Sequence, residues 1–142
     1  MFRPYRGNFK IDWYPKAAST AFSEGALVYF NGSGAIIPAD ATSGDHIGVI
    51  QKAVASTDAD YASTTMVPVL VPVSDQCEWL VDISTGTGAT SLVGTTVDLT
   101  DSLNLDVSAA AKDAVTVTQH VSTTKAVVKI NNLFTNFRTV TT

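Results

Sequence analysis

The chain has 142 residues and a mass of 15.0 kDa, with 45% hydrophobic and only 15% charged residues. This composition is typical of one folded globular domain, and the length is too short for two domains of ordinary size. The net charge is −4, but residues 1–16 hold four cationic residues and one aspartate, so this segment carries +3 and the rest −7. A basic end on an acidic body favours contact with an acidic partner, and the body's charge disfavours nucleic-acid binding.

Residues 1–20 are predicted to form an extended arm that docks onto a partner. The segment shows neither helical nor alternating periodicity, yet it contains five aromatic residues, and large apolar rings draw a segment onto a surface. The candidate partner-binding residues of the arm are the aromatic Phe2, Tyr5, Phe9, Trp13 and Tyr14 and the cationic Arg3, Arg6 and Lys10.

Residues 21–131 are predicted to form a β domain. Segments 26–30 and 35–38 flank an Asn-Gly turn and predict a hairpin, and a third strand is expected over 47–51. In segment 66–73, Pro68 and Pro72 remove two ladder donors, which predicts an edge or kinked strand. Segment 77–83 alternates in polarity and places Trp79 in the core.

The second half of the domain follows the same pattern. We expect a loop over 84–94, an antiparallel pair over 96–99 and 103–107, one helical turn over 109–113, and closing strands over 115–118 and 126–130. The tail, residues 132–142, is expected to be a second docking segment through Phe134 and Phe137. Short strands without a helical period predict an all-β fold, a small single-domain sandwich or barrel with an extended N-terminal arm.

The sequence contains no recognisable catalytic or metal-binding pattern. The single cysteine, Cys77, and two histidines do not make a zinc site, and the loop aspartates do not have EF-hand spacing. Gly86 and Gly88 lack the third glycine of a dinucleotide-binding turn, and Asp45 and His46 are neighbours whose side chains diverge on an extended chain. We therefore expect a protein that is not an enzyme and binds no metal or cofactor.

Membrane spanning and export are not expected either. No apolar run reaches the roughly 18 residues that cross a bilayer, and the first residues lack the apolar stretch of a signal peptide.

One segment of the β body carries a family resemblance. A pattern Gly-x-x-Val-Tyr, then Pro-Ala-Asp, then Ile-Gly-Val is present at Gly25, Val28, Tyr29, Pro38, Ala39, Asp40, Ile47, Gly48 and Val49, and Val67-Pro68-Val69 also fits. The run 22–54 that contains it resembles the small capsid cement (decoration) proteins of tailed bacteriophages. The resemblance covers about the first half of the β body and includes no catalytic residue.

The resemblance implies a structural protein on the outside of the virion. Such a protein, often a homotrimer, clamps neighbouring major capsid subunits against internal pressure after assembly in the host cytoplasm. Its expected partners are the major capsid protein and other copies of itself, without nucleic acid, membrane or cofactor. Two alternatives remain. One is a head-tail connector, tail or fibre component, and the other is a carbohydrate-binding β module that uses Trp13 and Tyr14.

Overall fold

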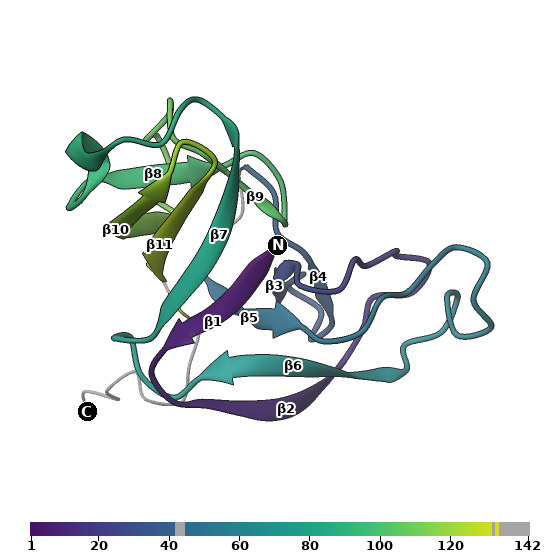
Figure 1. Ribbon diagram of the computed structural model, residues 1–142. Coiled ribbons are helices and arrows are strands. Elements are labelled where there is room, and N and C mark those ends of the chain that lie inside the picture. Colours follow the sequence, from purple (N-terminus) through teal and green to yellow (C-terminus); the bar gives the residue numbers. More distant parts are fainter. Residues whose placement is uncertain (42–44, 132, 134–142) are drawn as a thin grey trace.

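The computed structural model describes residues 1–41, 45–131 and 133, and over these residues the protein is all-β, with no α-helix and one short 3-10 turn (Figure 1). The strands are β1 (Phe2–Arg6), β2 (Phe9–Pro15), β3 (Leu27–Phe30), β4 (Ile36–Pro38), β5 (His46–Ile50), β6 (Met66–Pro72), β7 (Glu78–Thr85), β8 (Thr96–Leu99), β9 (Asn104–Asp106), β10 (Val115–Ser122) and β11 (Lys125–Ile130); the 3-10 turn η1 spans Thr90–Leu92. The predicted all-β fold is confirmed.

The first sheet has the strand order β1-β7-β11-β10-β8-β9, and β9 pairs back onto β7. This additional pairing is parallel and uses the second half of β7, from Asp82 to Thr85. Strands β7, β11, β10, β8 and β9 therefore form a closed five-stranded barrel, which removes its free edges. Strand β1 pairs with the first half of β7, from Glu78 to Val81, beside the barrel.

The second sheet has the order β2-β6-β5-β3-β4. A parallel bridge between Lys16 and Ile36 joins the chain just after β2 to β4, and the Ala17 amide donates to the Ile36 carbonyl over 3.0 Å. The sheet thus curves until its first and last strands meet at one end. Figure 1 shows β2 at the outside of this sheet, with β6 on one side of it.

The core consists of two hydrophobic clusters, and the first contains Leu27 and Val49 of the second sheet as well as residues of the first sheet. Trp79 of β7 is fully buried in the first cluster, and the ring of Phe9 packs edge-on against it at a centroid distance of 4.8 Å. The second cluster lies inside the second sheet and includes Val28, Val67 and Val69, all fully buried. The expectation that Trp79 is a core anchor is confirmed.

Most of the strands expected from the sequence are present. The hairpin is β3 and β4 in antiparallel pairing, and β8 and β9 form the expected antiparallel pair. The helical turn expected over 109–113 is wrong. The carboxylate of the buried Asp98 accepts hydrogen bonds of 2.9 Å from the amides of Ala111, Lys112 and Asp113, so these donors do not support a helix.

Strand β6 is not an edge strand, because it lies between β2 and β5. The even-numbered residues of β6, which include both prolines, direct their backbone groups toward β5 and not toward β2. The hydrogen bond from the Gln51 amide to the Pro68 carbonyl shows this direction. The missing donors of Pro68 and Pro72 therefore face β5, which pairs with β6 only at Leu70 and Val69, and the ladder between β2 and β6 is uninterrupted.

The N-terminal segment is extended, as expected, but it is built into both sheets. Strand β1 pairs with β7 and strand β2 pairs with β6 over its whole length. Residues 1–20 are therefore not an arm that projects from the β domain, and three of their five aromatic rings, those of Phe2, Phe9 and Tyr14, pack in the chain's own two clusters.

The two tryptophans provide a matched test of this packing. Trp79→Ala should lower the free energy of unfolding by about 3–5 kcal/mol, since it removes a fully buried ring from the first cluster. Trp13→Ala should change it by no more than about 0.5 kcal/mol, because the Trp13 side chain is 58% exposed. Urea unfolding of both variants measures this, and similar losses in the two would contradict the described core.

Candidate functional site

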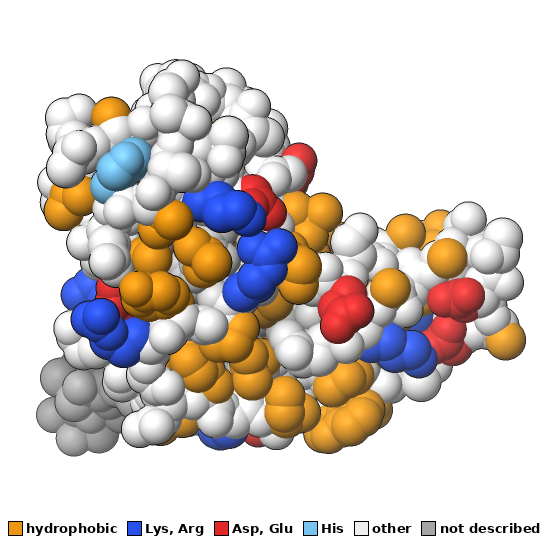
Figure 2. Space-filling model, in the orientation of Figure 1, with side chains coloured by type: hydrophobic (Ala, Val, Ile, Leu, Met, Phe, Trp, Pro, Cys, Tyr) orange, Lys and Arg blue, Asp and Glu red, His pale blue; other side chains and the backbone are white. Residues whose placement is uncertain are grey.

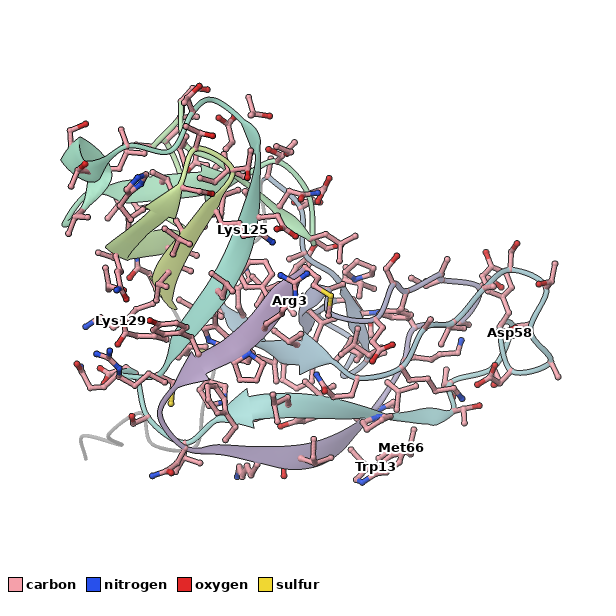
Figure 3. The ribbon with its side chains drawn as sticks, viewed as in Figure 1. Arg3, Trp13, Asp58, Met66, Lys125 and Lys129 are labelled. Atoms are coloured by element: carbon pink, nitrogen blue, oxygen red, sulfur yellow. The ribbon has the colours of Figure 1, made fainter. Side chains whose placement is uncertain are left out.

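The outer face of the β2-β6 pair carries three exposed large apolar side chains. Ile11, Trp13 and Met66 are 48%, 58% and 49% exposed. In the β2-β6 register Trp13 is opposite Pro68, and Pro15 is opposite Met66, and residues opposite one another in a sheet share a face. We call Ile11, Trp13 and Met66 the β2-β6 strip. Figure 3 shows Trp13 and Met66 side by side at the end of these strands, and Figure 2 shows apolar side chains along the same side of the molecule.

The alternation of β2 and β6 explains why this face is exposed. Val67, Val69 and Val71 of β6 point to the other face and are buried in the second cluster, together with the partly buried Tyr14 of β2. The residues between them in sequence must then face outward. At one end of this face Phe9 and Leu70 pack against the first cluster, whereas the side chains of the strip remain exposed to solvent.

Three of the five aromatic residues expected to bind a partner are instead part of the protein's interior. Phe2 is 1% exposed in the first cluster, and Phe9 packs on Trp79. Tyr14 packs edge-on against Phe30 at 5.5 Å and donates from its hydroxyl to Asp12 over 3.4 Å. The structure leaves Trp13 and Tyr5 exposed, and places them on different strands.

The cations of the N-terminal segment contact the protein's own carboxylates. Arg3 lies 3.9 Å and Lys125 2.9 Å from the Asp82 carboxylate, and Figure 3 shows both around β1 and β7. The hydrogen bond from Lys125 is the main reason that the pKa of Asp82 falls to about 2, with the N-terminal amine adding to it. These cations outnumber the carboxylate that they share, so this face keeps an excess of positive charge.

The other two cations that were expected to bind a partner also have neighbours of opposite charge. Arg6 lies 3.3 Å from Glu78 and 5.8 Å above the Tyr5 ring, and Lys10 lies 3.3 Å from Asp12. Both side chains are about half exposed or more, so these pairs hold them loosely. Phe134 and Phe137, the two candidates of the tail, lie outside the described residues.

Lys16 is a buried cation with a structural role. Its side chain is fully buried, and its ammonium donates to the carbonyls of Tyr61 at 2.7 Å, Ser63 at 2.8 Å and Ala17 at 3.3 Å. These bonds attach the long β5-β6 connection, which extends to one side in Figure 1, to the end of β2. The three carbonyl oxygens satisfy the ammonium's three donors.

The sequence analysis missed Ile11 and Met66. Met66 precedes the buried Val67, and Pro68 and Leu70 alternate with buried valines in the same way, whereas Ile11 lies between the polar Lys10 and Asp12. The alternation of β6 is visible in the sequence, but it identifies the outward face only when the neighbour of β6 is known, because its β-branched residues would suit either face.

The described residues contain no group of three or more histidine, cysteine or acidic side chains arranged to hold a metal ion. Among them there is also no helix long and apolar enough to span a membrane. Comparison with known proteins found no matching family and no matching curated protein.

The buried His46 gives the stability a pH dependence. Burial lowers the pKa of His46 from 6.5 to about 4. Between these two values the unfolded chain binds a proton that the folded protein does not, so stability falls as the pH is lowered from 6.5 to 4. We expect a loss of roughly 3 kcal/mol from this residue.

Urea unfolding at a series of pH values from 7 to 4 measures this loss. His46→Gln should show a much smaller decline, because the remaining slope comes from carboxylates alone. Equal slopes for the two proteins would contradict the assignment to His46.

Proposed function

We propose that this chain is a structural virion protein that binds the outer surface of a phage capsid and reinforces contacts between major capsid subunits. The observation that carries the proposal is the β2-β6 strip, a line of exposed apolar side chains on an otherwise well-packed β body. The resemblance of residues 22–54 to capsid cement proteins supports the same role, and this run contains β3, β4 and β5 of the second sheet.

The strip has the chemistry of a protein-binding surface. Trp13 is the most exposed of its side chains, and tryptophan is among the residues that contribute most to binding energy when a partner covers them. Flanking Ile11 and Met66 add apolar area, and methionine adapts its shape to the surface it meets. A contact of this size is modest, but many copies on a symmetric shell add their contacts together.

The charge distribution supports an acidic partner surface. Arg3 and Lys125 share one carboxylate, and Arg6 is largely exposed beside Glu78. Exposed cations at the rim of an apolar contact mainly set orientation and association rate. We therefore infer that the face of β1 and β7 lies near acidic groups of the capsid protein.

The alternative of carbohydrate binding is less well supported by the same surface. Sugar sites place hydrogen-bonding side chains beside the aromatic platform. Trp13 is flanked by the apolar Ile11 and Met66, and Tyr14 is turned into the second cluster, where it packs on Phe30. A head-tail connector, tail or fibre component would use the strip in the same way, and the shape of the particle to which the protein binds separates these roles.

Co-sedimentation with undecorated tailed-phage shells tests the proposal. The wild-type protein should sediment with the shells, and Trp13→Ala should bind about tenfold or more weakly, because it removes the largest side chain of the strip. Val121→Ala is the matched control, since Val121 is a similarly exposed apolar residue on β10, away from the strip. Absence of wild-type binding, or equal binding by the two variants, would contradict the proposal.

A further inference from the structure

Strand β2 uses only one of its two edges. In the β2-β6 ladder the Lys16 amide donates to the Thr65 carbonyl and the Val73 amide donates to the Asn8 carbonyl. Residues with even numbers in and around β2 therefore direct their backbone groups toward β6. The alternate residues Phe9, Ile11 and Trp13 direct their amides and carbonyls away from it.

These outward groups form a free strand edge within the described part of the chain. No other described strand pairs with β2, and the neighbouring chain is engaged only beyond it, where the Ala17 amide donates to the Ile36 carbonyl. A free edge with exposed apolar side chains is a template for another strand, which natural proteins normally block with proline, lysine or a bulge. Here Pro15 ends the strand, but the edge from Phe9 to Trp13 is regular.

We propose that two copies of this chain pair through their β2 edges as antiparallel strands, with a two-fold axis at Ile11. In this register Ile11 is opposite Ile11 of the second copy, and Phe9 is opposite Trp13 of the second copy. The outward amide and carbonyl of all three residues then hydrogen-bond across the axis. The contact is isologous, because the same surface serves both copies.

The charges of β2 select this register. It places Lys10 opposite Asp12 of the second copy, and Asp12 opposite Lys10 of the second copy. A shift of two residues in one direction places Lys10 opposite Lys10, and the same shift in the other direction places Asp12 opposite Asp12. Like charges directly opposite one another in a sheet are destabilising, and opposite charges are stabilising. The register that pairs the most backbone groups is thus also the one with complementary charge.

The pairing also brings the two β2-β6 strips onto one continuous sheet face. Ile11 of one copy then lies beside Ile11 of the second, and Trp13 lies beside Phe9 of the second, so one face carries the exposed apolar side chains of both copies. The pairing does not depend on the capsid role, because it needs only the protein itself. One strand pair is a small contact, so we expect a dissociation constant on the order of micromolar.

The mass of the full chain in solution tests the pairing, measured by sedimentation over concentrations from below to well above that range. The wild-type protein should reach twice the 15.0 kDa of one chain. Lys10→Asp and Asp12→Lys should each weaken the dimer about tenfold or more. Both variants should stay folded, since the intrachain Lys10–Asp12 pair is solvent-exposed and contributes little; circular dichroism checks this.

An equimolar mixture of Lys10→Asp and Asp12→Lys provides the decisive control. In a mixed dimer every charge of one variant meets the opposite charge of the other, so the mixture should dimerise at concentrations at which each variant alone is still monomeric. The doubly substituted chain should likewise recover the wild-type dimer. A wild-type mass of one chain at all concentrations, a mass of three chains, or a mixture that stays monomeric would each overturn the proposal.

Discussion

Gly7 and Asn8 allow one short stretch of chain to serve two sheets, and the arrangement of the whole molecule depends on this connection. Gly7 adopts a φ of +112°, which disfavours other residues, and an added Cβ would lie 2.8 Å from the Cys77 sulfur. The Cys77 thiol in turn donates to the Asn8 carbonyl over 3.2 Å. Strand β1 therefore leaves the first sheet beside β7, and β2 enters the second sheet beside β6 within two residues.

This connection decides which aromatic residues reach solvent. Phe2 and Phe9 enter the first cluster, on either side of the turn, while Tyr14 enters the second. The alternation of β2 then leaves Ile11 and Trp13 on the outer face, beside Met66 of β6. The same alternation directs the spare backbone groups of β2 away from β6. An apolar face and a free edge are thus two consequences of one strand position, and both favour association with other protein chains.

The sequence predicted the β body well because its signals are local. Turn residues around Asn31 and Gly32 set the β3-β4 hairpin, and the alternation around Trp79 placed that ring in the core. Two of the expectations that failed, the helical turn and the projecting arm, depend on contacts distant in sequence. Residues 109–113 are held by Asp98, and the N-terminal segment pairs with β7 and β6 some 50 to 80 residues later. Basic and aromatic composition could not distinguish a segment that docks on a partner from one that docks on its own chain.

Of the three residues of the candidate site, Trp13 was expected from the sequence. Ile11 and Met66 could be identified only from the register of β2 against β6.

Hydrogen exchange of the β2 amides, resolved by residue, tests most directly whether this strand is paired on one edge and free on the other. At low protein concentration the account predicts slow exchange at Lys10, Asp12 and Tyr14, which face β6, and fast exchange at Phe9, Ile11 and Trp13. The fast amides should become protected as the protein concentration rises. Uniformly fast exchange along residues 9–14 would mean that the segment is an unattached arm, and uniformly slow exchange in the dilute protein would mean that the outer edge of β2 is already covered within one chain.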